Sequence, residues 1–433
     1  MKYKAEAFDI WQNLCKTVLG YEPLIRCRID FAGRVDLRAL KQAVDLSIHV
    51  IPLIGCCFSD SRNRPRWVEK NFTSEDMIRV IEADSSAGDN AERQIARLLS
   101  SDFDAAKEPP LNILLIRRAY GDTLCVIISH MVCDGGGFKQ YLYLLGNLYT
   151  ALESGRPVSI QPFNPQVCTR GLQPLFKGVK LKEKARILCS KNNAYGSANK
   201  KGQQGVSFGK DGSEPHMKTR GISNGHFERL KSFAKMHGAT VNDILMALYA
   251  RAFCKNTGTE KIMLPSTMDL RKFMPPGANF GISNYASTCM CHISVQATDS
   301  LADTLRQVSG QMWAHKTGNA ILKPTLFWDM LTHFLPYSLV KLYFANVVTV
   351  PAILYSNLGI LDQNLLRFGN LLIENAYSTS SIKPAPYLQI NASTYNGCCT
   401  LCCDFYGSDI DEKWVNVLLD DICAEIESLA RAA

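Results

Sequence analysis

The stretch TLCVIISHMVCDGGGFKQYLYLLGNLYTALE (123–153) combines three signals that decide the fold. It opens on an uninterrupted apolar run, the pattern of a buried strand. Three glycines, Gly135 to Gly137, follow and allow other groups to approach the backbone closely. After them, apolar residues recur at the three- and four-residue spacing of a helix as far as Leu152. The stretch therefore predicts a strand, a glycine turn and an amphipathic helix in direct succession.

Short strands and helices alternate on both sides of this stretch. The apolar run at 111–118 precedes it across a turn at 120–122, and the two runs predict a hairpin. Nearer the N-terminus, Asp36 is placed to cap a helix over 37–48. The other expected helices lie at 7–19, near 91–101, and at 224–237, 239–253, 299–316, 324–333 and 411–429, and the other expected strands lie at 23–31, 261–271, 350–356, 385–393 and 399–406.

The composition is that of an ordinary globular protein. Of the 433 residues, 46% are hydrophobic and 20% are charged, which excludes a disordered chain, a collagen-like chain and a coiled coil. A chain of this length favours two or three domains and buries a large core without disulfides. The most apolar window, 342–361, contains Asn346, Pro351 and Gly359, so it is predicted to be core or strand rather than a membrane span.

The first residues and the cysteines bear on the cellular compartment. Residues 1–4 lead into an amphipathic helix rather than a continuous apolar segment, so no signal peptide is expected. The 16 cysteines are therefore expected to be reduced thiols in the cytoplasm. The C-C-x-x-C-C run at 398–403 alternates along an apolar strand, so core packing is favoured over a zinc site and no metal is expected.

One basic stretch carries a charge equal to that of the whole chain. The net charge of +8 is mild for the length and gives no reason to expect a nucleic-acid partner. Nine Lys or Arg and a single acid lie between Arg170 and Lys201. A solvated linker at 166–205 is the favoured interpretation. The alternative is a docking patch for phosphates, an acidic carrier protein or, through peripheral contact, an anionic membrane.

His130 and Asp134 lie four residues apart where the buried strand meets the glycine run. An imidazole at this position can act as a general base because its pKa lies near neutrality. Backbone N–H groups at the start of the following helix favour negative charge nearby. The spacing alone is weak, because a histidine that is hydrogen-bonded within a turn produces the same pattern.

The sequence SHMVCDGGG (129–137) resembles the H-x-x-x-D-G active-site motif of an acyltransferase superfamily. Its members include chloramphenicol acetyltransferase, nonribosomal peptide condensation domains, plant BAHD acyltransferases, wax ester synthases and alcohol acetyltransferases. Ser129 stands where many condensation domains have a first histidine, and the missing plant D-F-G-W-G sequence argues against the plant branch. Further segments resemble the family in the expected order, at 31–58, 239–253, 268–287, 355–359 and 390–407.

This resemblance implies an α/β (mixed α+β) fold of two similar chloramphenicol acetyltransferase-like subdomains. Each has a mixed sheet flanked by helices, and an active-site tunnel runs between them. The N-terminal half, 1–165, carries the motif, the basic linker spans 166–205, and the C-terminal half spans 206–433. A crossover segment near 350–395 is expected to contact the N-terminal half.

The resemblance also implies acyl transfer from a thioester to a hydroxyl or amine of a small-molecule acceptor. His130 deprotonates the acceptor, which attacks the thioester directly without an acyl-enzyme. The donor is acyl-CoA or an acyl-phosphopantetheine on a carrier protein, used as co-substrate, and no tightly bound cofactor is expected. A monomer is expected. A non-catalytic binding or carrier-docking protein of the same fold is the alternative.

Carried over residue by residue, the motif assigns several supporting roles. Asp134 is expected to turn away from the substrate and pair with Arg271, while Gly135 and Gly136 keep the tunnel wall clear. Asn357 points toward the reacting carbonyl or, alternatively, caps its own strand. Ser356 and Tyr395 are weaker candidates for substrate contact.

Overall fold

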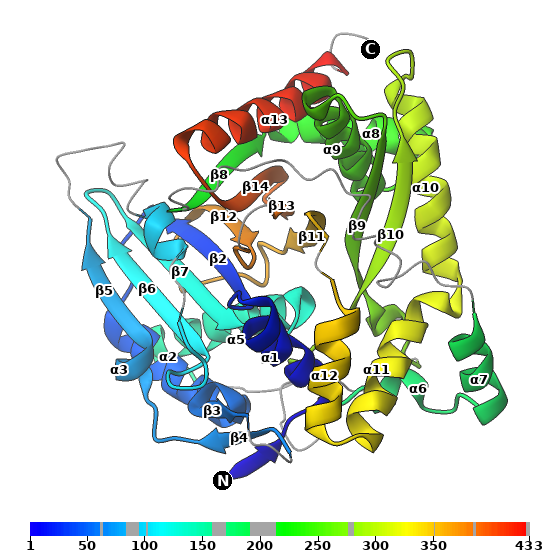
Figure 1. Cartoon of the computed structure of the whole chain (residues 1–433). Coiled ribbons are helices and arrows are strands. Elements are labelled where there is room, and N and C mark those ends of the chain that lie inside the picture. The colour runs from blue at the N-terminus through cyan, green and yellow to red at the C-terminus, as the bar shows by residue number, and fades with distance from the viewer. Residues whose placement is uncertain are drawn as a thin grey trace.

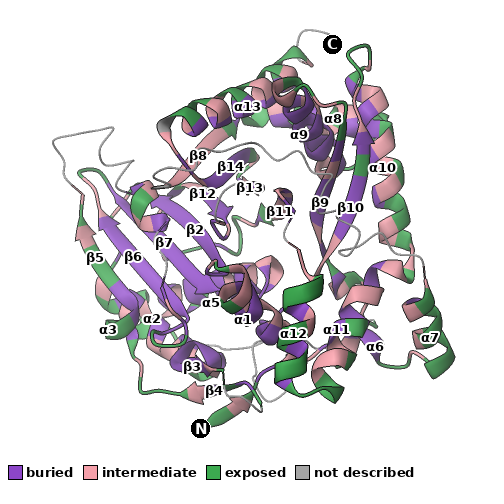
Figure 2. Ribbon diagram, in the orientation of Figure 1, coloured by how far each residue is buried: buried purple, intermediate pink, exposed green. Residues whose placement is uncertain are grey.

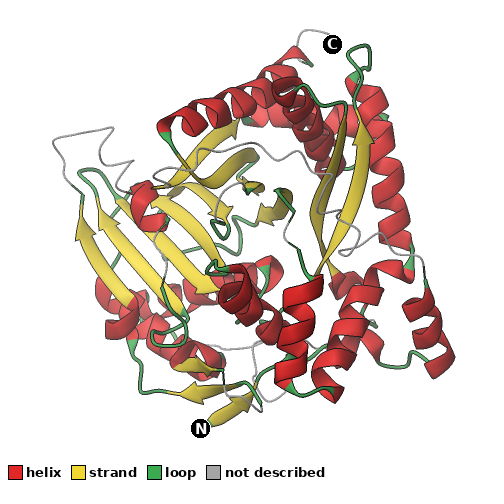
Figure 3. Ribbon diagram, viewed as in Figure 1, coloured by secondary structure: helices red, strands yellow, loops and turns green. Residues whose placement is uncertain are grey.

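Two mixed β-sheets organise the chain, one in each half, and helices pack against both (Figure 1, Figure 3). The computed structural model describes residues 1–60, 64–83, 95–100, 103–157, 170–190, 214–275, 281–349, 351–383 and 387–429. The first sheet has the order β12 (Ile373–Thr379), β2 (Leu24–Phe31), β7 (Asp122–Ser129), β6 (Leu111–Arg117) and β5 (Ile78–Glu82). The second has the order β10 (Ala286–Ser294), β9 (Lys261–Asp269), β11 (Ile353–Leu361), β13 (Leu388–Tyr395), β14 (Cys398–Gly407) and β8 (Glu214–Ile222).

Strand β7 lies at the centre of the first sheet and leads directly to His130. It pairs antiparallel with β6, with Leu111 opposite Ile128, which confirms the predicted hairpin. On its other side it pairs with β2, with Leu24 opposite Ser129. Every residue of β7 is buried (Figure 2), so the strand fixes the position of the loop that follows it.

Helices cover this sheet as the sequence patterns predict. The Asp36 side chain accepts hydrogen bonds from the backbone N–H groups of Arg38 and Ala39 and so begins the second helix. The glycine run begins the long amphipathic helix that packs against it. The helices and turns of this half are α1 (Ala7–Leu19), α2 (Leu37–Val50), the 3-10 turn η1 (Pro52–Gly55), α3 (Ser74–Met77) and α5 (Gly135–Glu153), and β1 (Lys2–Lys4), β4 (Arg66–Glu69) and β3 (Cys56–Ser59) form a small third sheet.

The second sheet is covered by helices with well-formed N-termini. At the first turn of α9, the Thr240 side chain accepts from Asp243 N while the Asp243 carboxylate accepts from Thr240 N, a capping box. The helices of this half are α8 (Asn224–Met236), α9 (Val241–Thr257), α10 (Leu301–Thr317), α11 (Lys323–Phe334), α12 (Tyr337–Val347) and α13 (Asp409–Ser428), with 3-10 turns η2 (Leu270–Phe273) and η3 (Asn319–Leu322).

One segment of the second half crosses to the first sheet. Strands β11 and β13 are parallel neighbours in the second sheet, but β12, which lies between them in sequence, pairs antiparallel with β2. The residues after β12 stay close to β2, because the Ser381 hydroxyl accepts from Leu24 N at 2.8 Å and donates to Leu24 O at 3.0 Å. The crossing therefore brings residues 378–383 beside the end of β7.

The basic stretch is more ordered than a solvated linker. Its described part, 170–190, contains the short helices α6 (Gln173–Phe176) and α7 (Leu181–Cys189), and α7 packs against α11. Ile187 is buried in this contact because apolar residues interrupt the lysines at helical spacing. The described part of the predicted linker therefore contains two short helices, one of which packs on the C-terminal half, and 166–169 and 191–205 lie outside the described residues.

The apolar window at 342–361 is divided between a helix and a strand. Pro336 begins α12, in which Val340 and Phe344 are four residues apart and buried. Phe344 packs edge-to-face on Trp11 of α1, with ring centroids 5.0 Å apart. The strand prediction thus holds only for the β11 part of the window. Among the described helices, none is long and apolar enough to cross a lipid bilayer.

Candidate active site

His130 lies where two cavities meet between the halves of the molecule. The large cavity has a volume of about 180 Å³ and the small cavity about 150 Å³. Both are lined by His130 and by Trp11 and Gln12 of α1, together with Thr267 of β9 and Thr288 of β10. The imidazole therefore borders both cavities, and both halves of the molecule supply the cavity walls.

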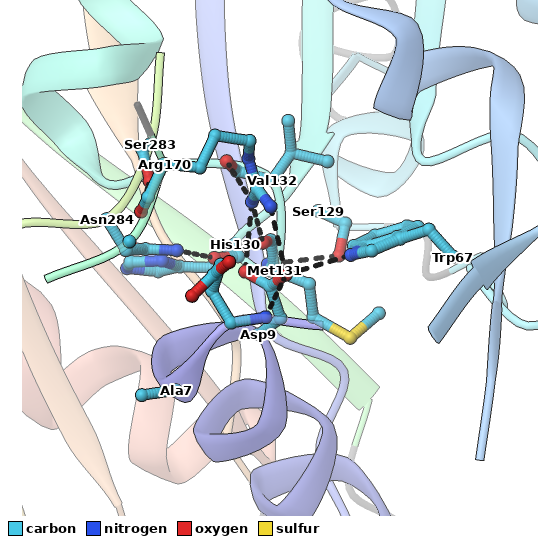
Figure 4. A network of polar contacts seen from close by, with 12 residues as sticks. Ala7, Asp9, Trp67, Ser129, His130, Met131, Val132, Arg170, Ser283 and Asn284 are labelled. Atoms are coloured by element: carbon cyan, nitrogen blue, oxygen red, sulfur yellow. Dashed lines mark hydrogen bonds and ion pairs between the residues drawn. The ribbon is translucent and has the colours of Figure 1, made fainter. Parts of the chain in front are cut away.

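Two hydrogen bonds fix the backbone of His130, and, among the described residues, one nitrogen of its ring is unbonded. Its N–H donates to Pro23 O at 2.7 Å, and its carbonyl accepts from Asn284 Nδ2 at 2.6 Å (Figure 4). Among the described residues, Nδ1 of the ring has no hydrogen-bond partner. Burial lowers the pKa of His130 below its ordinary value of 6.5, against the opposing effect of the Asp134 carboxylate. The imidazole is therefore neutral at pH 7.

Asp134 forms the expected ion pair with Arg271. Two hydrogen bonds of 2.9 Å join the guanidinium to both carboxylate oxygens. The carboxylate also accepts from Gly137 N at 2.8 Å, which caps α5, and from Tyr285 N at 2.6 Å. Burial alone would lower the pKa of Arg271, but the Asp134 carboxylate outweighs it and raises that pKa above the ordinary value. Asp134 is thus fully occupied in holding the loop.

A second buried ion pair holds the other side of the loop, and the sequence did not indicate it. Arg170 donates to both carboxylate oxygens of Asp9, at 2.9 and 3.0 Å (Figure 4). It also reaches the carbonyls of Met131 and Val132 at 3.4 and 3.3 Å. Arg170 therefore belongs to the support of the site and not to the solvated basic stretch in which its sequence position placed it.

The glycines after Asp134 make room for different neighbours. Gly135 lines the large cavity, and a Cβ there would lie 2.7 Å from Leu358 Cδ1. A Cβ on Gly136 would lie 2.6 Å from Arg271 Nη1. Gly136 thus leaves space for the ion pair, whereas the expectation assigned it to the tunnel wall.

The candidates for substrate contact separate into one residue at the cavity and two away from it. Ser356 lines the large cavity, and its hydroxyl lies 3.1 Å from the Thr267 hydroxyl. Asn357 Oδ1 accepts from Gly359 N at 2.7 Å, so its amide oxygen holds a bulge in its own strand, the alternative left open by the sequence. Tyr395 lies at the far end of β13, opposite Leu361 and Cys398.

The far end of the large cavity is polar, which the sequence did not predict. Hydroxyl and amide side chains from the end of β12 and from β13 line it beside a lysine, and we call this set of residues the polar end: Ser378, Thr379, Ser380, Ser381, Lys383, Gln389 and Asn391. Burial lowers the pKa of the Lys383 ammonium to about 8.

Most of the described cysteines belong to the core, but Cys189 and Cys398 are exposed. Cys133, Cys402 and Cys403 are buried, and burial raises the pKa of each thiol above its ordinary value, which disfavours the reactive thiolate. Within the described ranges, no group of three or more His, Cys, Asp or Glu is arranged to hold a metal ion.

No family model matches the chain. Over 242 residues, 53% of the chain, it is 22% identical to the cyclosporin synthetase of Tolypocladium inflatum, and the match spans 2% of that protein's length.

Solved structures match the chain over almost its whole length. Polyketide synthase associated protein 5 from Mycobacterium tuberculosis has a TM-score of 0.67 at 15% identity, with 98% of each chain covered. The first condensation domain of the CDA synthetase has a TM-score of 0.63 at 15% identity, covering 98% of this chain and 97% of that one. The epimerization domain of the third module of tyrocidine synthetase B has a TM-score of 0.61 at 13% identity, covering 100% and 98%.

The chain therefore has the two-subdomain, chloramphenicol acetyltransferase-like fold. It is the form of that fold seen in condensation domains, so the resemblance indicated by SHMVCDGGG is confirmed at the level of the fold.

Proposed function

We propose that this protein transfers an acyl group from a thioester to a hydroxyl or amine, with His130 as the general base. One observation carries the proposal. A neutral imidazole, with a ring nitrogen unbonded among the described residues, lies where two cavities meet. Two substrates entering from opposite sides would meet at this ring.

The reaction needs one proton to move twice. His130 takes the proton of the acceptor as its oxygen or nitrogen attacks the thioester carbonyl, which gives a tetrahedral intermediate. When the carbon–sulfur bond breaks, the imidazolium returns the proton to the departing thiolate. A positioned base contributes a factor of about 10²–10⁴, and holding two substrates in line offsets roughly 7–11 kcal/mol of the barrier.

The acyl donor is acyl-CoA or the phosphopantetheine arm of a carrier protein. The Ser356 and Thr267 hydroxyls, 3.1 Å apart at the cavity wall, are available to orient the reacting groups. The supporting ion pairs of Asp134 and Arg170 do not contact substrate in this scheme. They act by fixing the loop that presents the imidazole.

Replacing the imidazole tests the proposal directly. We expect His130→Ala to lose at least 90% of kcat in a thiol-release assay that presents a panel of acyl-CoAs with a pool of alcohols and amines. His292→Ala, at an exposed histidine of β10, is the matched control and should keep full activity.

Two outcomes would contradict the proposal. Retention of more than a tenth of kcat by a folded His130→Ala protein would assign the base to another residue. A wild-type protein that cleaves no thioester, from either CoA or a carrier arm, but binds an acyl carrier protein would favour the non-catalytic docking alternative.

A further inference from the structure

We propose that the polar end of the large cavity binds a carboxylate of one substrate through the ammonium group of Lys383. The inference rests on the proposed function, because it describes a substrate of the His130 site. It assigns that substrate a chemical class: a molecule that carries a reacting hydroxyl, amine or acyl group at one end and a carboxylate at the other.

The position of Lys383 follows from the crossing of the chain. After β12 pairs with β2, the Ser381 hydroxyl ties the following residues to Leu24, next to the end of β7. Lys383 comes two residues later and lines the same cavity as His130. Its charge is one of the effects that lower the pKa of His130, so the two groups lie within electrostatic reach of each other.

A chain of buried amides holds the ammonium without neutralising it. Lys383 Nζ donates to Gln389 Oε1 at 2.7 Å. The Gln389 amide is oriented with its oxygen toward the lysine because Nε2 donates to Asn391 Oδ1 at 2.9 Å and to the Ser380 hydroxyl. Gln389 and Asn391 are only 6% and 5% exposed, so this arrangement is fixed by packing.

The nearby carboxylate is engaged elsewhere. Asp404 Oδ2 accepts from Asn391 Nδ2 at 3.0 Å, from Ser380 N at 3.4 Å and from the Thr379 hydroxyl. Burial raises the pKa of Asp404 to about 6, against the opposing effects of the Arg26 and Lys383 charges. None of the hydrogen bonds that Asp404 accepts here comes from the Lys383 ammonium.

A buried positive charge is costly unless a counter-charge is near. The Lys383 ammonium donates to a neutral amide oxygen, so a carboxylate in the cavity would supply a counter-charge. Of the hydroxyls of residues 378–381, those of Ser378, Thr379 and Ser381 donate to protein oxygens, and the Ser380 hydroxyl accepts from Gln389, which leaves the Ser380 proton for a ligand. A carboxylate bound there would offset the desolvation of Lys383.

Binding at Lys383 would also act on the general base. Because the lysine charge lowers the pKa of His130, a carboxylate paired with that lysine should raise it. The correct substrate would therefore make the imidazole a stronger base at the moment the reacting group arrives. This effect can be read from the His130 ring resonances by NMR titration with and without ligand.

The test uses equilibrium binding without any acyl donor. The probes are ω-hydroxycarboxylates from 4-hydroxybutyrate to 12-hydroxydodecanoate and their methyl esters, titrated against the full chain by calorimetry. We expect at least one acid to bind at least tenfold more tightly than its ester. Lys383→Met should reduce the affinity of that acid to the level of the ester, and Lys383→Arg should retain the preference. Inorganic phosphate serves as a competitor to test whether the site prefers another anion.

Lys323→Met is the matched control, since Lys323 is also half-buried and its Nζ donates to a neutral oxygen, Ser190 O, at 2.7 Å. Its preference should equal that of the wild type. The acid affinity should fall as the pH rises through about 8, where Lys383 loses its proton. Burial lowers the pKa of Lys383 to about this value, against the opposing effects of Cys15 and Asp404. The ester affinity should not change.

Three results would overturn the inference. The first is equal affinity of acids and esters in the wild type, and the second is an unchanged preference for acids in Lys383→Met. The third is that no acid binds at about 10 mM, the order of weak ligand affinities. Displacement of the acids by phosphate at equal concentration would also reject carboxylate as the class. Because no donor is present, failure here is distinct from failure of acyl transfer in the thiol-release assay.

Discussion

At the scale of single residues, the site separates one reacting group from several supporting ones. The His130 backbone donates to Pro23 O and accepts from Asn284, while Nδ1 of its ring has no hydrogen-bond partner among the described residues and is available for proton transfer. Asp134 forms an ion pair with Arg271, and Arg170 forms an ion pair with Asp9. The loop between strand and helix is thus fixed from both sides while the imidazole stays exposed to substrate.

The lowered pKa of His130 sets the pH dependence. A general base must be deprotonated, and burial moves its pKa below 6.5. We expect the acidic limb of kcat/KM to have its midpoint below pH 6.5, because the buried imidazole becomes half protonated only there. A pH–rate profile measured with saturating donor checks this. An acidic limb centred at or above 6.5 would mean that the group is not this buried histidine.

The ion pair of Asp134 and Arg271 should appear in stability as well as in rate. Removing either partner leaves a buried charge without its counterpart, which costs about 3–5 kcal/mol. In a double-mutant cycle with Asp134→Ala and Arg271→Ala, we expect a coupling energy well above about 0.5 kcal/mol from urea unfolding. The exposed pair Glu228–Lys231 should show far smaller coupling. Additive losses at Asp134 and Arg271 would mean that the pair does not stabilise the loop.

The residue-level prediction from sequence succeeded where the motif is local. His130 directly follows a buried strand and Asp134 caps the helix after it, as the pattern predicted, because strand, loop and helix are consecutive in the chain. Arg170 and Lys383 were missed as site residues. Their partners or neighbours are distant in sequence, 161 residues away for Arg170 and Asp9, and no local spacing signals such a contact.

At the scale of elements, helices with strong caps and periodicity were predictable from their own pattern, whereas the crossing was expected only from the resemblance and no pattern indicated strand β12. Both α2 and α9 begin at the residues their capping patterns indicate. In contrast, β12 carries polar residues, Ser378 and Thr379, that are buried only because the strand enters the other half of the molecule. The local sequence pattern indicates which face of a helix or strand is buried, but not which distant element packs against it.

The start of α5 makes a test at this scale. A Cβ at Gly136 would meet Arg271 Nη1 at 2.6 Å, so Gly136→Ala should displace the guanidinium. Overpacking of this kind costs typically 1–3 kcal/mol. Thermal unfolding and thiol release should both be impaired. Gly225→Ala at the start of α8, where a Cβ would meet nothing within 4 Å, is the control. Equal stability of the two variants would show that the ion pair tolerates the methyl group.

At the scale of the whole molecule, the site is built from residues of both halves of the chain. One half supplies the loop that carries His130, and the other supplies Arg271 and the Thr267 wall. Residues of the crossing segment, from strands of both sheets, then line the polar end of the large cavity. A substrate that spans the large cavity would contact both halves, so its binding should be coupled to their relative position.

The basic helix α7 extends this arrangement toward the small cavity. It packs against α11, whose Pro324, Thr325 and Trp328 line that cavity. Both proposed donors carry phosphate on the pantetheine arm, and a carrier protein adds an acidic surface. The charge of α7 would therefore attract a donor approaching from this side, over the Debye length of about 8 Å at physiological salt.

Neutralising Lys177, Lys180, Lys182 and Lys184 together tests this steering. We expect KM for the donor to rise and its dependence on salt to flatten, while kcat at saturation stays nearly unchanged, because the charges act before the chemical step. A carrier-protein donor should be affected more than acyl-CoA, since it presents more negative charge. A variant with four other exposed lysines neutralised is the control: Lys70, Lys107, Lys235 and Lys261. If KM for every donor is the same as in the wild type at both low and high salt, α7 supports α11 and does not steer the donor.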